Sequence, residues 1–314
     1  MKDKIFFFIN ILIFLLTTLF FQVKSLSLEN NIIIKVNNEI ITTYDLENEI
    51  NYLNILNPNI KKLDENEKIN FSKKSIIQEK IKQIEIQNIF DNPNIPDEYL
   101  ESFLKNIYTK IGIKDLNDFK KYLNLNNIKY DFVLSKIETE ALWNELIFLK
   151  FSKKIKIDED QLLKNIRDNS NNVSKSYLMS EILFEINQNE KLEQKYKEIS
   201  RVILKQGFEN AALKFSISET AKIGGELNWI NENSLNKTIK KKLNGLQKNQ
   251  FTDPITIPGG FLILKIVDTK EEKKEINIQE ELDKLIAETK NNQLNRFSIM
   301  YFNRIKKDTE INEI

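Results

Sequence analysis

The chain has 314 residues, contains neither cysteine nor histidine, and carries a formal net charge of +1 at pH 7. These absences exclude disulfides, thiolate nucleophiles, imidazole bases and His-ligated zinc. A carboxylate site for Mg²⁺ or Ca²⁺ stays open, but no D-x-[DN]-x-[DN]-G loop is present. Because this loop is absent, we expect no metal. Because acids and bases are interleaved along a near-neutral chain, we expect no nucleic-acid partner.

The first 25 residues are typical of a secretory signal peptide. Lys2 and Lys4 precede the apolar run from Ile5 to Phe21, and Val23-Lys24-Ser25 offers a cleavage site. The alternative is an uncleaved anchor helix, since the run is about long enough to span a thin bilayer. The sequence therefore predicts export, with membrane contact only through this segment if it is retained.

The next part of the chain predicts one short strand pair followed by helices. Ile32–Val36 is expected to form a buried strand, Asn37-Asn38 a turn, and Thr43 the N-cap of a helix. Apolar residues at helical spacing then predict further helices within 76–89, 97–112, 116–123, 132–151 and 158–175, the last running into a linker.

From Ser176 the pattern changes to mixed strand and helix. Tyr177–Phe184 reads as a strand, a last long helix begins at Ile278, and Glu310–Ile314 alternates like a short edge strand. Because an exposed apolar stripe is costly, we expect the last helix to pack on the N-terminal helices and the last strand to pair with Ile32–Val36. The predicted class is α+β: a mainly helical N-terminal domain, completed by the C-terminal helix, with an inserted α/β domain.

The most specific motifs lie between Phe208 and Lys265. Gly224-Gly225-x-Leu-x-Trp is followed by Gly260-Phe261-x-Ile-Leu-Lys, and this succession resembles the parvulin (PpiC-type) family of peptidyl-prolyl isomerases. We interpret the glycine pair as a turn with positive φ, and we expect Trp229 to lie in the core.

The resemblance also implies an active site, at which this sequence departs from the family. Catalytic parvulins carry histidines where this chain has Glu181 and Leu262, and Ser218 falls on the position of the catalytic Cys or Asp. Ser218 is therefore the candidate catalytic residue, whereas Glu181 and Leu262 are expected to be non-catalytic. The apolar proline pocket of the family maps onto Leu227, Leu235, Ile239 and Leu243. The family needs no cofactor.

The order of segments along the chain resembles SurA-type periplasmic chaperones with one parvulin domain. Ile34-Lys35-Val36-Asn37-Asn38-Glu39-Ile40-Ile41-Thr42 with Asp45-Leu46 resembles the start of that family, and Arg304-Ile305-Lys306-Lys307 its end. The resemblance implies a signal peptide over 1–25, a SurA-like helical domain over 28–172, a parvulin-like domain over 174–270, and a C-terminal helix and strand over 276–314 that pack on the helical domain.

The resemblance implies a periplasmic folding factor that binds unfolded polypeptides, in particular outer-membrane proteins. We expect weak or no isomerase activity, because a pocket that binds planar and twisted amides equally well gives affinity without rate. The alternative is an active isomerase with a histidine-free site, in which Ser218 donates a hydrogen bond to the twisted amide. Whether the chain is an enzyme stays open at this point. The client is expected in an apolar cleft shared by the helical domain and residues 174–270.

Overall fold

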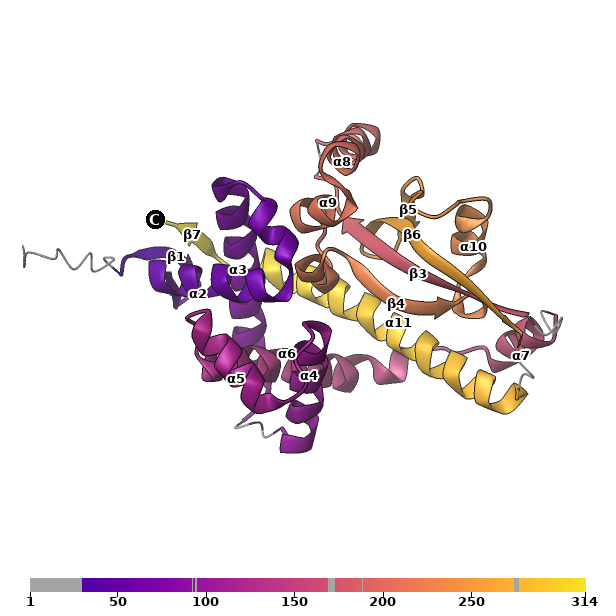
Figure 1. Cartoon of the computed structure of the whole chain (residues 1–314), viewed down its shortest axis with the longest axis horizontal. Helices are drawn as coiled ribbons and strands as arrows, with labels where there is room; N and C mark the ends of the chain where they lie inside the picture. The colour runs from indigo at the N-terminus through magenta and orange to yellow at the C-terminus, as the bar shows by residue number, and fades with distance from the viewer. Residues whose placement is uncertain (1–29, 92, 94, 169–172, 188, 274–276) are drawn as a thin grey trace, which may run out of the picture. The chain divides into compact units, whose positions relative to one another are not determined.

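The computed structural model describes residues 30–91, 93, 95–168, 173–187, 189–273 and 277–314. The predicted signal peptide over 1–25 lies outside these residues. Ile32–Ile314 form one compact unit, built from helices and two antiparallel sheets (Figure 1), which confirms the α+β class. Within the described ranges, no helix combines the length and the apolar character that a membrane span requires. The domain boundaries over 28–172, 174–270 and 276–314 stay a prediction.

A three-stranded sheet joins the two ends of this unit. Strand β1 (Ile32–Val36) pairs antiparallel with β2 (Glu39–Thr42) on one side and with β7 (Ile311–Glu313) on the other. Asn37 makes the turn between β1 and β2 with φ of 51°, a conformation that Asn tolerates. The last strand therefore forms a sheet edge beside β1, as the alternating pattern at the C-terminus predicts.

Helix α2 (Thr43–Leu56) begins one residue earlier than the sequence suggests, because its N-cap is Thr42 rather than Thr43. The Thr42 hydroxyl accepts from the Asp45 N–H at 3.3 Å, and the Asp45 carboxylate accepts from the Thr42 N–H at 2.9 Å. This reciprocal capping box satisfies two backbone donors at once, so it favours Thr42 over its neighbour as the first residue outside the helix.

The segment between β2 and β3 is helical and contains two apolar clusters. One gathers Leu53, Leu104 and Phe119, and the other surrounds Trp143 and includes Tyr301 from the far end of the chain. The elements of this segment are the 3-10 turn η1 (Pro58–Lys62), α3 (Glu65–Ile89), α4 (Asp97–Lys110), α5 (Leu116–Leu125), α6 (Tyr130–Phe151), the 3-10 turn η2 (Ser152–Lys154) and α7 (Glu159–Asp168).

The second half holds a four-stranded sheet of order β4-β3-β6-β5. Its two central strands are longer than the sequence indicates: Val173 pairs with Lys273, although residue 173 falls in the stretch predicted to be a helix running into a linker. Backbone pairing continues along the whole ladder to these ends. The elements are β3 (Val173–Phe184), α8 (Leu192–Gln206), α9 (Phe208–Phe215), η3 (Glu219–Ile223), β4 (Glu226–Asn231), η4 (Glu232–Ser234), α10 (Lys237–Leu243), β5 (Ile255–Ile257) and β6 (Gly260–Lys273).

Helix α11 (Ile278–Lys307) returns to the helical half, as the sequence predicts. The Trp143 indole N–H donates to the Ser298 hydroxyl at 2.8 Å, and the rings of Phe151 and Phe297 stack with their centroids 5.0 Å apart. These contacts hold α11 against α6. The first turns of α11 pack instead against α7, so the helix is anchored at both ends.

Candidate functional site

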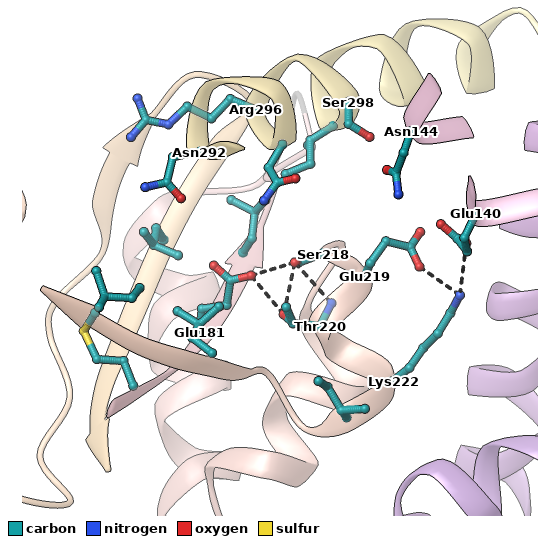
Figure 2. Close-up of a pocket in the computed structure, with 18 of the residues that line it drawn as sticks. Glu140, Asn144, Glu181, Ser218, Glu219, Thr220, Lys222, Asn292, Arg296 and Ser298 are labelled. Atoms are coloured by element: carbon teal, nitrogen blue, oxygen red, sulfur yellow. Dashed lines mark hydrogen bonds and ion pairs between the residues drawn. The ribbon is translucent and has the colours of Figure 1, made fainter. Parts of the chain in front are cut away.

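A cavity of about 1100 Å³ opens between the helical half, the four-stranded sheet and α11 (Figure 2). Its lining comes from α4 and α6 on one side, from β3, η3, β4 and α10 on another, and from the middle of α11 on a third. The cavity is therefore shared by the helical half and the parvulin-like part. The sequence predicts that the client polypeptide binds in a cleft between these two parts.

One wall of the cavity is apolar and includes three of the four residues predicted for the proline pocket. Leu227, Leu235 and Ile239 line the cavity, together with Leu262 from one of the family's histidine positions. Leu243 does not line the cavity, which corrects the sequence prediction. It is only 1% exposed and is buried inside the core cluster to which Leu235, Ile239 and Leu262 also belong, because α10 turns its last residue toward the sheet.

A compact group of polar side chains adjoins the apolar wall. The Ser218 hydroxyl donates to Glu181 Oε1 at 2.7 Å, and the Thr220 hydroxyl donates to the same oxygen at 2.9 Å (Figure 2). Ser218 and Glu181 are predicted from the sequence to share one site, and in the structure their side chains are hydrogen-bonded. Thr220 is a member that sequence reasoning misses, although a Ser-x-Thr pair at the start of a helical turn is a signal for capping.

The glycine pair brings η3 against β3. Gly224 and Gly225 have φ of 73° and 80°, as predicted. A Cβ on Gly225 would lie 2.2 Å from the Glu181 carbonyl oxygen, and the Glu181 N–H donates to the Gly225 carbonyl at 2.7 Å. On the other side of the loop, the Ile217 N–H donates to the Leu183 carbonyl at 2.7 Å. The Ser218 hydroxyl is thus held beside Glu181 by backbone contacts.

Burial shifts the pKa of Glu181. Its carboxylate is removed from water, which raises its pKa, and the hydrogen bonds from Ser218 and Thr220 lower the pKa by less. With both hydroxyls donating to Oε1, neither proton is available to a molecule in the cavity. An ionised Glu181 has no proton to donate either.

We expect Glu181→Gln to raise the free energy of unfolding near neutral pH. A carboxyl whose pKa is raised on folding gives up stability as the pH rises past its unfolded value of 4.5. Gln keeps an accepting oxygen for Ser218 and Thr220 but carries no charge. The gain should vanish well below pH 4.5, where the wild-type carboxyl is neutral in both states. Urea unfolding at both pH values measures this, with the exposed Glu226→Gln as control; destabilisation near neutral pH would contradict it.

Ion pairs clamp η3 onto the helical half. Lys82 of α3, which is only 2% exposed, contacts Glu140 of α6 at 2.8 Å and Glu219 of η3 at 2.6 Å. Lys222 contacts Glu219 at 2.8 Å. Burial alone would raise the pKa of Glu219, but the charges of Lys222 and Lys82 hold it well below its usual range. The Lys74 ammonium also donates to the Ser216 carbonyl at 2.6 Å.

Trp229 is not in the core, contrary to the prediction. Its side chain is 39% exposed, with the Lys270 ammonium 5.0 Å from the ring centroid. The reason is its place on β4, an edge strand of the sheet, where a large ring can remain partly in solvent. Among the described residues, no cluster of three Asp or Glu side chains is arranged to hold a metal ion.

Comparison with known proteins agrees with this geometry. Residues 181–268 match the family model for the rotamase domain of the PPIC type, and this range includes Glu181, Ser218 and Leu262. A SurA chaperone from Buchnera aphidicola is 28% identical over 284 residues, which cover 85% of this chain and 65% of that protein. The chain is similar to the SurA chaperones, and its residues 181–268 match a parvulin (PPIC-type) domain.

Two further matches describe the extent of this relation. A SurA chaperone from Pseudomonas putida is 24% identical over 185 residues, or 56% of this chain and 43% of that protein. The chain thus spans less than two thirds of both curated SurA relatives. Among solved structures, a protein from a study of SurA-like chaperones of Campylobacter jejuni aligns with 91% of this chain and 99% of its own, with 17% identity and a TM-score of 0.34.

Proposed function

We propose that this SurA relative is a periplasmic folding factor that holds unfolded polypeptides, in particular outer-membrane proteins, and that its parvulin site has weak or no isomerase activity. The cavity of about 1100 Å³ carries the proposal. It is as large as the pockets that enclose drug-sized ligands, so it has room for several residues of an extended chain. The signal-like first 25 residues support the periplasmic location.

The apolar wall supplies a driving force for binding. Burial of one Leu or Phe side chain of a client contributes roughly 1.5–3 kcal/mol. Leu227, Leu235 and Ile239 offer contiguous apolar surface for this purpose. Such binding does not distinguish one apolar sequence from another, which suits a chaperone with many clients, and it requires neither ATP nor a metal ion.

The polar group explains why we expect little isomerase activity. Rotation about an X-Pro bond must overcome a barrier of roughly 18–20 kcal/mol, because amide resonance is lost in the twisted state. A catalyst lowers this barrier by donating a hydrogen bond that is stronger in the twisted state. Here the Ser218 and Thr220 hydroxyls donate to Glu181, and an ionised Glu181 repels an amide oxygen.

One observation favours an active, histidine-free isomerase as the second candidate. The Ser218 and Thr220 hydroxyls line the same cavity as the apolar wall, so they lie in the position that a catalytic donor requires. A bound X-Pro segment would have to draw one hydroxyl away from Glu181. In that case the donor is Ser218, and its removal lowers the rate.

NMR exchange spectroscopy of an X-Pro peptide separates the two candidates. We expect the mature protein to broaden the peptide lines through binding, without faster cis/trans exchange, and Ser218→Ala to change neither result. Faster exchange that Ser218→Ala abolishes would establish the isomerase instead.

Light scattering of an unfolded outer-membrane protein tests the chaperone itself. We expect the mature protein to suppress its aggregation and Leu227→Asn to weaken the suppression. Leu204→Asn is the control, since Leu204 is 79% exposed and lies on α8 outside the cavity lining. A mature protein that suppresses no aggregation would contradict the proposed function.

A further inference from the structure

Two cations in the cavity lining differ from the others in lacking an ion-pair partner. Lys136 pairs with Glu79, and Lys222 pairs with Glu219. Lys110 of α4 and Arg296 of α11 also line the cavity, but no carboxylate of the described residues lies within ion-pair distance of either. Lys110 is exposed, whereas Arg296 is partly buried. A guanidinium that lines a cavity without a counter-charge can bind an anion through several N–H donors.

Arg296 stands on a rigid support. The next two residues of α11 are fixed to α6, since Phe297 stacks on Phe151 and Ser298 accepts from Trp143. Asn292, one helical turn earlier, also lines the cavity, and Figure 2 shows both side chains on the same side of α11. Residues four apart are neighbours on a helix surface, so the guanidinium and the amide act on the same part of a ligand.

Glu181 is not the counter-charge of Arg296. Its Oε1 is engaged by Ser218 and Thr220, and no ion pair joins it to Arg296 in the described part of the chain. When ionised it also repels a second carboxylate, so an acidic ligand is directed toward α11. The apolar wall lies on the sheet side, whereas α11 brings Arg296 into the cavity lining on the other side, alongside apolar residues.

We propose that Arg296, with Asn292 beside it, binds a carboxylate of the client polypeptide while neighbouring apolar side chains of that client cover Leu227, Leu235 and Ile239. This inference rests on the proposed function and names its substrate class: extended apolar segments that carry a carboxylate, on an Asp or Glu side chain or at the chain end. The planar guanidinium can hold both carboxylate oxygens at once, which gives such segments an advantage over neutral ones.

Fluorescence anisotropy with three labelled peptides tests this. Two are Leu- and Phe-rich, capped at both ends, and differ only in one internal Glu or Gln; the third has no internal acid and a free carboxyl terminus. We expect the wild-type protein to bind at least one carboxylate peptide about tenfold more tightly than the Gln peptide, with a smaller advantage in high salt. Whichever carboxylate peptide gains affinity identifies the source of the charge.

Substitution of Arg296 tests the assignment to this residue. Arg296→Gln should remove the tenfold advantage and leave the affinity for the Gln peptide unchanged, and Arg296→Lys should restore part of the advantage. Arg201→Gln on α8 is the matched control, because Arg201 is exposed and lies outside the cavity lining. An advantage that survives Arg296→Gln, or an equal loss for all three peptides, would overturn the inference. If no peptide binds the wild-type protein, the proposed function fails as well.

Discussion

Lys136→Met is expected to lower the free energy of unfolding by about 3–5 kcal/mol, the cost typical of removing one partner of a buried ion pair. The Lys136 ammonium lies 2.5 Å from the carboxylate of Glu49, which is 0% exposed, and it also contacts Glu79. Burial alone would lower the pKa of Lys136, but the charges of Glu49 and Glu79 raise it above its usual value. Met fills a similar volume and leaves the buried Glu49 carboxyl without its partner.

Chemical denaturation measures this loss, and two further variants identify its cause. The exposed pair Lys121–Asp118 is the control, and Lys121→Met should cost far less than Lys136→Met, because solvent screens exposed ion pairs. Adding Glu49→Gln to Lys136→Met replaces the unpaired buried carboxyl by a neutral amide. The double variant should therefore recover at least half of the lost stability. If Lys136→Met and Lys121→Met lower the free energy of unfolding equally, the buried ion pair contributes no more to stability than the exposed one.

Gly225→Ala is expected to have the second largest effect, because it combines two penalties. A residue with a Cβ at φ of 80° costs about 1–2 kcal/mol. The new methyl would also meet the Glu181 carbonyl oxygen at 2.2 Å, and relief of such overpacking costs about 1–3 kcal/mol more. The turn before β4 must move away from β3, which separates Ser218 and Thr220 from Glu181.

Gly245→Ala is the matched control for this substitution. Gly245 has a similar φ of 83°, but an added Cβ would meet no atom within 4 Å. The difference between the two variants in denaturation midpoint therefore isolates the close approach to Glu181. We also expect Gly225→Ala, but not Gly245→Ala, to weaken peptide binding in the cavity. If both variants lose equal stability, the Glu181 carbonyl does not obstruct a side chain at position 225, and the prediction fails.

Hydrophobic patterns within short segments predicted much of the fold. The apolar run at residues 32–36 and the alternation at residues 310–314 indicate two strands, and the cost of an exposed apolar stripe predicts that the last helix returns to the first helices. Both β1 and β7 form and pair, and α11 packs on α6. These predictions succeed because each depends on a property of a short segment, its periodicity and its need for burial.

The predictions that were wrong depend on neighbours outside the segment. Leu243 reads as a pocket residue and Trp229 as a core residue, yet the first is buried behind the cavity and the second is partly exposed on an edge strand. The start of β3 lies in the stretch predicted to be a helix running into a linker, but it pairs with the end of β6. In all three cases the environment of the side chain is set by an element distant in sequence.

The sequence by itself determined the secondary-structure pattern, the exclusion of thiol and imidazole chemistry, and the resemblance to parvulins and SurA chaperones. Only the tertiary structure decided that the Ser218 proton is engaged by Glu181, that Thr220 joins this group, and that Arg296 enters the same cavity. Lys82 and Glu219 are 137 positions apart in the chain, yet their ion pair helps to hold the cavity walls together. Hydrogen bonds and ion pairs act over a few ångströms in space, so only the folded chain reveals which distant residues share a site.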